Sequence, residues 1–501
     1  MPRPAGAKEG MAPMRGPLFN QDSTEFFYTH GPDEMSGEAV DAWVDGLAEA
    51  GVGTLFSNVN AMKTNYASKV WEPDWHGYDP AAGDDQPVLR HDVEGGAAGT
   101  RRRLDAAMRL AALGVNFHER AFARCKRHGI GCWASIRMND LHDCHLEDSA
   151  LLSTFYKEQR AAGKVRVPYR FTGWPDRALD WSRPEVREHY MKLVREVLTF
   201  EGIEGLELDW MRCGWHFPIG RELEGGRILT AWIAEVRELC NETAKRVGHP
   251  VRLGCRVPST PETARRLGMD GALWAREGLI DLLVVTPFWA TCEFNMPLRT
   301  WKRLLEGTEC LLAGGLEVRY QPYPSGPATL MTPELAAGAA TAVLKAGADF
   351  VYLFNYFADM HLGGYWTREQ YNQTLAAMGS LSAVARLPRR HAVTYRDTRA
   401  PGEPADNSLP ATGNLCQFRL QTGPKPVGRA VEVLLELEPL GEGELAAPEV
   451  RVNSVLCPPP ARQASTVFVY SVPGEALTDE ETVVEASGSA MRIVRVEIII
   501  R

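Results

Sequence analysis

Two carboxylates lie two residues apart on a short apolar run near the middle of the chain. The run 202–210 contains Glu207 and Asp209, which a two-residue strand period places on the same face. Three residues that could bind a polar ligand follow it: Arg212, Trp215 and His216. Charges on a buried strand are costly unless they are paired or used. The pattern therefore predicts either chemistry at the end of this strand or an ion pair of Glu207 or Asp209 with Arg212.

Polar and aromatic side chains also end the other apolar runs of the first 390 residues. Besides Asp209 and Glu317, the candidates at these ends are Asp22, Asn58, Asn60, Arg137, Asn139, Glu207, Arg212, Trp215, His216, Arg256, Trp289, Arg319 and Asn355. Asn and Arg side chains can donate hydrogen bonds to hydroxyl groups. As a group the arginines also suit a planar carboxylate or sulfate, although each alone fits a structural pair. The tryptophans could stack on sugar rings, while each alone fits core or rim packing.

The apolar runs alternate with helical patterns. Expected strands cover 18–23, 52–60, 130–137, 202–210, 251–257, 279–288, 310–319 and 349–356. Expected helices cover 36–50, 101–128, 224–247, 297–305, 332–345 and 367–385, and two more begin at Ser182 and Pro261. Eight such units predict an α/β fold, a (β/α)8 TIM barrel over residues 18–390, with its active site at the carboxyl ends of the strands. We expect a flexible tail over 1–17 and aromatic-rich insertions at about 61–99 and 140–181.

The composition changes after Pro388. All 13 Trp precede residue 370. Short alternating runs between Pro- and Gly-rich turns cover 415–420, 430–437, 450–456, 466–472 and 492–500. They predict a C-terminal antiparallel β-sandwich domain over 397–501. It could bind sugar, but the absence of Trp from this region favours a packing role.

Two carboxylates of the expected barrel could share one substrate. The fourth and seventh strands face each other across the mouth of an eight-stranded barrel, and hydrolysis of a glycosidic bond needs one carboxylic acid and one carboxylate. We predict Asp209 and Glu317 as the catalytic pair, with Asp209 ionised beside Arg212 and Glu317 protonated under an aromatic rim; the reverse assignment stays open. A carboxyl separation of about 5 Å would predict retention of configuration, and about 6.5–9.5 Å inversion.

Two stretches, 179–187 and 205–212, resemble the bacterial glycosyl-hydrolase-like TIM barrels. The resemblance covers about residues 18–385 and implies a carbohydrate substrate with acid and base carboxylates at strand ends. The chain lacks the Asn-Glu-Pro signature of the large retaining clan and has Asp209 at the end of the fourth strand. In other barrel glycosidases an Asp on that strand is the nucleophile.

The whole-chain composition excludes several classes of protein. The 501 residues carry a formal net charge of -9, which argues against a nucleic-acid partner. No window approaches the roughly 18 apolar residues that span a bilayer, so no membrane partner is expected. No secretory signal is visible, so the expected compartment is the cytoplasm, with secretion open if the start is trimmed. The ten cysteines contain no C-x-x-C pair and fit a reducing compartment. A homo-oligomer stays open.

Other chemistries lack their motifs. His142-Asp143-Cys144-His145 could hold a metal, but no His-x-His follows the first strand, and we expect no metal and no cofactor. Neither a phosphate-binding loop nor a Gly-x-Ser-x-Gly elbow is present. Two alternatives to a glycoside hydrolase stay open: a noncatalytic carbohydrate-binding barrel, and a lyase or isomerase acting on sugar acids.

Overall fold

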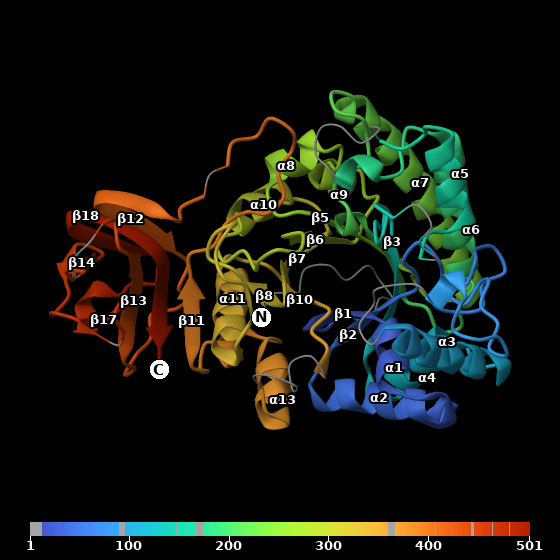
Figure 1. The fold of residues 1–501 in the computed structure, drawn as a ribbon, viewed down its shortest axis with the longest axis horizontal. Helices are drawn as coiled ribbons and strands as arrows, with labels where there is room; N and C mark the ends of the chain where they lie inside the picture. The colour runs from blue at the N-terminus through green and yellow to red at the C-terminus, as the bar shows by residue number, and fades with distance from the viewer. Residues whose placement is uncertain are drawn as a thin grey trace. The chain divides into compact units, whose positions relative to one another are not determined.

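The structure of the chain is a computed structural model (Figure 1). It describes residues 13–89, 96–146, 149, 151–166, 174–358, 366–405, 407–441, 445–462, 464–479 and 481–501. Eight parallel strands close a barrel in the order β1-β10-β7-β6-β5-β4-β3-β2. Their bounds are β1 Leu18–Asp22, β2 Thr54–Asn58, β3 Gly131–Arg137, β4 Gly205–Asp209, β5 Arg252–Pro258, β6 Leu282–Thr286, β7 Leu311–Leu316 and β10 Phe350–Phe354. The predicted TIM barrel is therefore confirmed.

Helices connect these strands. They are α1 Thr24–Thr29, α2 Gly37–Glu49, α3 Gly96–Ala112, α4 Phe117–His128, α5 Thr154–Ala161, α6 Pro184–Val197, α7 Glu222–Val247, α8 Pro261–Arg266, α9 Gly271–Arg276, α10 Leu298–Leu304, α11 Pro333–Lys345, α13 Arg368–Ala377 and α14 Leu381–Val384. Two short strands, β8 Arg319–Tyr320 and β9 Thr329–Leu330, pair with each other. None of the described helices is both long and apolar enough to cross a bilayer.

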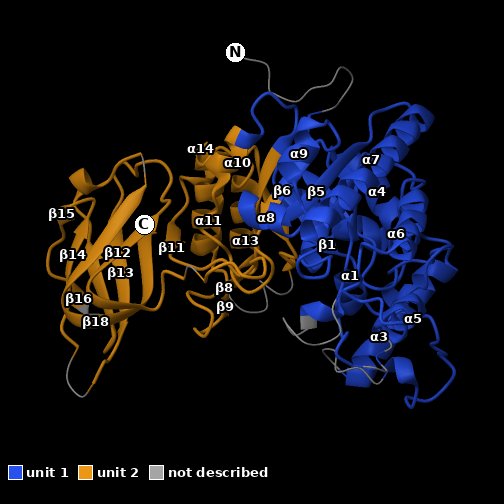
Figure 2. Cartoon of the chain, turned by 90° about the horizontal axis from the view of Figure 1, so that it is seen from above, with its two compact units in different colours: residues 1–284, 304–311 blue, residues 285–303, 312–501 orange. Residues whose placement is uncertain are grey.

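By internal contacts the chain divides into two compact units (Figure 2). Unit 1 comprises residues 1–284 and 304–311, and unit 2 comprises 285–303 and 312–501. Strands β1 to β5 belong to unit 1. All of β7 except Leu311, all of β10 and the strands after residue 388 belong to unit 2.

The single helix expected over 101–128 is wrong, because the segment forms two helices. Helix α3 ends at Ala112, and Gly114 adopts a left-handed conformation at φ 72°. Asn116 then starts α4, because its side chain accepts hydrogen bonds from the backbone N–H groups of His118 and Glu119. Glycine at position 129 ends α4, as predicted.

One aromatic side chain explains why β4 begins with glycine. Trp133 on β3 is 1% exposed and pairs in register with Gly205 on β4. A Cβ atom on Gly205 would lie 2.3 Å from the Trp133 ring, and one on Gly254 of β5 would lie 2.9 Å from it. The indole therefore occupies the space that side chains at these positions would need.

Replacing Gly205 with Ala is expected to lower the free energy of unfolding by about 1–3 kcal/mol, because the added methyl group overlaps a buried ring. The urea midpoint at constant slope measures the change. Gly46→Ala in α2 is the matched control, because nothing lies within 4 Å of its added Cβ. It should leave stability equal or raise it. Equal midpoints for both variants would contradict the packing argument.

The C-terminal sheet is antiparallel and organised by one long strand. Its strands are β11 Arg389–Ala392, β12 Ala411–Leu420, β13 Val431–Glu438, β14 Glu449–Val452, β15 Val455–Leu456, β16 Ala461–Arg462, β17 Val467–Ser471 and β18 Thr482–Ile500. The first part of β18 pairs with β12 and β14, and its last part with β13 and β11. The predicted β-sandwich-like domain is confirmed. Its first strand, β11, begins inside the range 18–390 expected for the barrel and ends just after it.

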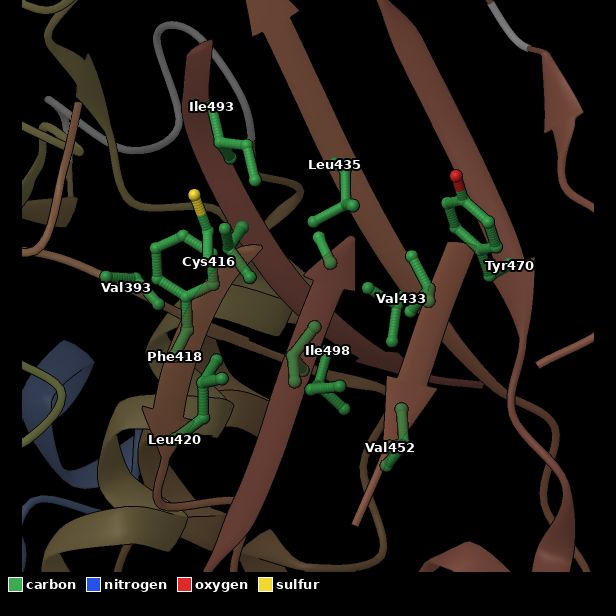
Figure 3. Close-up of a cluster of buried hydrophobic side chains, with 14 of the residues drawn as sticks. Val393, Cys416, Phe418, Leu420, Val433, Leu435, Val452, Tyr470, Ile493 and Ile498 are labelled. Carbon is green, nitrogen blue, oxygen red and sulfur yellow. The ribbon is translucent and has the colours of Figure 1, made fainter. Parts of the chain in front are cut away.

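A single apolar core holds this sheet together (Figure 3). Alternate residues of the strands are buried in it, as a two-residue period requires. Among its members are Phe418 on β12, Val433 and Leu435 on β13, and Ile493 and Ile498 on β18. The side chains of both parts of β18 thus contribute to one core.

Candidate active site at the strand ends

Strand register in unit 1 places three charged residues side by side. Asp209 on β4 pairs with Arg137 on β3 and with Arg256 on β5. Arg256 Nη1 lies 3.2 Å from Asp209 Oδ1 and 3.1 Å from Oδ2, and the backbone N–H of Met211 donates to Oδ1 at 2.9 Å. The Arg256 and Asp209 side chains are 0% and 1% exposed. The ion pair with Arg256, instead of the expected one with Arg212, fixes this carboxylate.

Arg137 connects Asp209 to two further carboxylates. Its Nη2 atom donates to Asp22 Oδ2 at 2.7 Å, and its Nη1 atom lies 3.6 Å from Asp140 Oδ2. Burial alone would lower the pKa of Arg137, but Asp22, Asp140 and Asp209 together raise it. One buried guanidinium therefore balances charges at the ends of β1, β3 and β4.

Asp22 is the more accessible partner of Arg137. Its side chain is 17% exposed. Burial raises its pKa, but Arg137 and two hydrogen bonds from Thr24 hold the pKa below the ordinary value. Asp22 is therefore ionised at neutral pH and reachable by a ligand.

Arg212 belongs to a neighbouring cluster with Asp140 and His142. Its Nε atom lies 3.7 Å from Asp140 Oδ2, and its Nη2 atom lies 3.4 Å from His142 Nε2. His142 Nδ1 lies 2.6 Å from Asp140 Oδ1. Burial raises the pKa of Asp140, but the charges of His142, Arg212 and Arg137 lower it more. The pKa of Asp140 is therefore well below its usual range. Within the described part of the chain, no group of three or more His, Cys, Asp or Glu residues could hold a metal ion.

Glu207 lies deeper than Asp209 and is fully buried. Its Oε2 atom accepts hydrogen bonds from Asn20 Nδ2 at 2.9 Å and from Ser135 Oγ at 2.6 Å. Asn20 also donates to Ser135 Oγ at 3.0 Å. These contacts cross-link β1, β3 and β4 beneath the charged network, so Glu207 supports the strands and offers no surface to a ligand.

Three of the four asparagines expected to bind hydroxyl groups bind backbone instead. Asn60 accepts from the backbone N–H of Arg137 and donates to the carbonyl of the same residue, both at 3.0 Å. Asn139 makes the same pair of bonds with Leu179, at 3.0 and 3.1 Å. Asn58 donates to the Ser135 carbonyl at 3.3 Å. All three are at most 1% exposed, so their amides fix loops and strands and are not accessible to a ligand.

His216 packs behind the network. It is fully buried, and its Nε2 atom lies 3.1 Å from the carbonyl oxygen of Trp210. The Trp210 ring meets it edge-on at 5.0 Å. Trp215 beside it is only partly buried. His216 therefore fixes the loop after β4 and has no atom free to meet a ligand.

Two buried histidines should make the protein sensitive to acid. Burial lowers the pKa of His118 and of His216 to about 3, whereas both titrate near 6.5 when unfolded. Below pH 6.5 the unfolded chain binds protons that the folded chain does not, so stability falls as the pH drops from 6.5 toward 3. At pH 5 the expected loss is about 2 kcal/mol for each histidine.

Urea unfolding at pH 5 and pH 8 measures this loss. His118→Asn keeps a polar group beside Ser57 and Asn65, whose side chains lie 2.8 and 2.9 Å from the His118 ring nitrogens. We expect the variant to be less stable at pH 8 but to lose less stability between the two pH values. A pH dependence unchanged by the substitution would contradict the argument.

Glu317 directly follows β7 in unit 2. It is 1% exposed, and the Tyr356 hydroxyl donates to its backbone carbonyl at 3.1 Å. Burial raises the pKa of the Cys292 thiol and of the Tyr356 hydroxyl, so both are uncharged at neutral pH. Asn355, at the end of β10, has φ 52°, a left-handed conformation that is rare outside glycine and concentrates at functional sites.

Trp289 and Arg319 form an exposed pair in the same unit. The Trp289 side chain is 51% exposed. The Arg319 guanidinium lies 4.6 Å from the centre of the Trp289 ring, within cation–π range. Both residues follow barrel strands, Trp289 after β6 and Arg319 after β7. These are the two binding candidates that the structure brings together in the open.

A carboxylate that sequence reasoning missed lies in the loop after β2. Asp74 accepts a hydrogen bond from Arg103 Nη1 at 2.9 Å, and its side chain is 13% exposed. Burial raises the pKa of Asp74, and the charge of Asp22 raises it further. The signal available in the sequence was the length and aromatic content of the loop, which point to a functional segment without selecting a residue.

A closed parallel barrel with ionised side chains at its carboxyl strand ends defines a TIM-barrel protein. Neither a scan of protein-family models nor a search of curated proteins gives a match to the sequence. The structure is similar to that of the endo-beta-1,4-mannanase from Thermotoga petrophila, with a TM-score of 0.45, 12% identity, and coverage of 96% of this chain and 97% of that chain. It is also similar to alpha-L-fucosidase isoenzyme 1 from Paenibacillus thiaminolyticus, with a TM-score of 0.35, 12% identity, and coverage of 94% and 95%. A third similar structure is the noncanonic maltogenic alpha-amylase AmyB from Thermotoga neapolitana, with a TM-score of 0.38, 8% identity, and coverage of 94% and 98%.

Proposed function

We propose that the chain is a glycoside hydrolase that acts at the carboxyl end of the barrel, with Asp209 and Glu317 as its two catalytic carboxylates. The observation that carries the proposal is the position of Asp209. Its carboxylate sits at the end of β4, bonded to Arg256 and to the Met211 N–H. A guanidinium and a backbone N–H together stabilise a negative charge and fix its direction, as a nucleophile or base requires.

In this proposal Glu317 donates the proton to the leaving oxygen. Its surroundings, the Cys292 thiol and the Tyr356 hydroxyl, are buried and uncharged at neutral pH. Low-dielectric surroundings favour the protonated form of a carboxylic acid. Asp209 would then attack the sugar or activate water, and the distance between the two groups would decide between retention and inversion.

An acidic or sulfated sugar is the substrate class that the arginines favour. Arg212 has a side chain 13% exposed, and Arg319 lies against the exposed Trp289 ring. A guanidinium binds planar carboxylate and sulfate oxygens through paired hydrogen bonds. Asp22, 17% exposed and ionised, could accept hydrogen bonds from sugar hydroxyls.

A second candidate is a noncatalytic carbohydrate-binding barrel. One observation favours it: Asp209 and Glu317 are each only 1% exposed. For hydrolysis the side chains around both carboxylates must move when a sugar enters. In a binding protein they would not need to.

A panel of p-nitrophenyl glycosides, neutral and acidic, tests the proposal. A hydrolase should release nitrophenol from at least one member, and acidic members should react faster than their neutral counterparts. Binding without release from any member, measured by calorimetry, would favour the noncatalytic barrel. Unsaturated products in place of reducing ends would instead indicate a lyase.

A further inference from the structure

A carboxylate from the segment between β11 and β12 of the C-terminal sheet binds the loop after β6. Asp397 Oδ1 accepts from the backbone N–H of Phe288 at 2.8 Å, and Oδ2 accepts from Trp289 and Ala290 at 2.7 and 2.8 Å. Three successive N–H groups that converge on one anion form a nest, a geometry that strongly favours a carboxylate. Here the carboxylate belongs to the chain itself, so the backbone at Trp289 is held in one conformation.

The same loop is bonded to the loop after β7. The backbone N–H of Cys292 donates to the carbonyl of Arg319 at 2.8 Å. Thr291 Oγ1 donates to the Gln321 carbonyl at 2.9 Å and accepts from the Gln321 N–H at 3.0 Å. These bonds fix the two residues of the exposed pair, Trp289 and Arg319, relative to each other.

The segment around Asp397 contacts both loops. Besides Asp397, which binds the loop after β6, Tyr395 donates its hydroxyl to Gln321 Oε1 of the loop after β7 at 2.5 Å. Thr394 Oγ1 accepts from the backbone N–H of Phe294 at 3.4 Å. Residues 394–397, which follow β11, thus bind the loops after both β6 and β7.

We propose that Asp397 is a positioning residue that orients Trp289 as a platform on which a sugar ring stacks. An aromatic ring held by a rigid backbone binds a ring face at low entropic cost. Arg319 beside it supplies the charge for an acidic substituent of that sugar. The identity of the ligand rests on the proposed glycoside hydrolase function, whereas the positioning of Trp289 does not. The segment between β11 and β12 thereby contributes to substrate binding and does more than connect two strands.

Asp397→Asn tests the positioning. The amide keeps the size of the side chain but loses the charge and at least one of the three acceptor contacts. For the p-nitrophenyl glycoside that the wild type hydrolyses fastest, we expect KM to rise about tenfold while kcat changes less than about twofold, because the platform binds ground and transition states alike. Trp289→Ala should give a similar rise, and the double variant no further rise, because both changes remove one contact.

Glu403→Gln is the matched control. Glu403 lies in the same segment, and its Oε2 atom accepts from the backbone N–H of Ala400 at 3.0 Å. Its KM should equal that of the wild type. If Asp397→Asn does not fold, Trp289→Phe, which keeps a ring face, should retain more of the affinity than Trp289→Ala.

Acrylamide quenching separates this inference from the proposed function. The fluorescence of Trp289 is obtained as the difference between each protein and its Trp289→Phe counterpart. We expect Asp397→Asn to change the quenching of Trp289 and Glu403→Gln to leave it unchanged. Unchanged quenching in Asp397→Asn would overturn the positioning role whatever the activity. Changed quenching with an unchanged KM would show that Trp289 is not a platform for the sugar. A wild type that hydrolyses no glycoside would overturn the proposed hydrolase function. The quenching result would still decide whether Asp397 positions Trp289.

Discussion

Asp209→Asn is expected to lower kcat at least about 10³-fold on any glycoside that the wild type hydrolyses, since the amide can neither attack nor accept a proton. The amide oxygen can still accept the Met211 N–H that now binds Oδ1 at 2.9 Å. It no longer neutralises the buried Arg256 charge, so the variant should be less stable than the wild type, and urea unfolding checks that it is folded before rates are compared. Initial rates of nitrophenol release, together with calorimetric binding of the same glycoside, measure the two effects separately.

Glu204→Gln is the control for this substitution. Glu204 lies just before β4, at the opposite end of the strand from Asp209, and its Oε2 atom accepts from the backbone N–H of Cys132 at 3.0 Å. Its variant should keep the wild-type kcat. If Asp209→Asn keeps more than about a tenth of the wild-type kcat, Asp209 is not a catalytic carboxylate, and the proposed mechanism is wrong.

Arg256→Met is expected to lower the free energy of unfolding by about 3–5 kcal/mol, because it leaves the Asp209 charge buried without its ion pair. Both side chains are at most 1% exposed, so water cannot replace the lost contact. The double variant Arg256→Met with Asp209→Asn should regain a large part of the loss, since it removes the unpaired charge as well. Urea unfolding of the wild type, the two single variants and the double variant completes the cycle.

An exposed arginine gives the comparison for Arg256. Arg266 on α8 donates to Glu262 at 2.7 Å, with side chains 49% and 66% exposed. Arg266→Met should change stability by less than about 1 kcal/mol. A double variant no more stable than Arg256→Met would show that Asp209 and Arg256 are not energetically coupled. The ion pair would then not be what fixes Asp209 in the proposed site.

The barrel was predictable because each strand is a short apolar run that ends in polar residues. The breaks within helical segments were harder to predict. Residues on both sides of 113–116 keep a helical pattern, and only Gly114 and the capping side chain of Asn116 separate α3 from α4. Local propensity indicates that a helix forms, whereas its continuity depends on single capping residues.

The positions of the charged residues at the strand ends were also predictable, but their partners were not. Arg212 is three residues from Asp209 in sequence, yet Arg256, 47 residues away, makes the ion pair because β4 and β5 are in register. The link from Asp397 to Trp289 spans 108 residues. Such pairings depend on strand register and loop paths, for which a single sequence contains no direct signal.

Asparagine illustrates a further limit of reading residue types. Asn60 and Asn139 stand at strand ends, where an amide can bind a hydroxyl group, but each uses both ends of its amide on one backbone residue. A buried backbone N–H or carbonyl group needs a hydrogen-bond partner, and an asparagine amide can supply it as readily as it can bind a ligand. The residue type alone therefore does not distinguish a binding side chain from one that closes a loop.

The long strand β18 has a consequence for biosynthesis. Strands β11, β12, β13 and β14 all pair with residues 482–500, so none of them has its principal neighbour until those residues leave the ribosome. During translation of roughly a hundred preceding residues, apolar faces such as that of β13 stay uncovered and open to chaperones or to aggregation. This sheet can therefore be completed only after residues 482–500 have been synthesised.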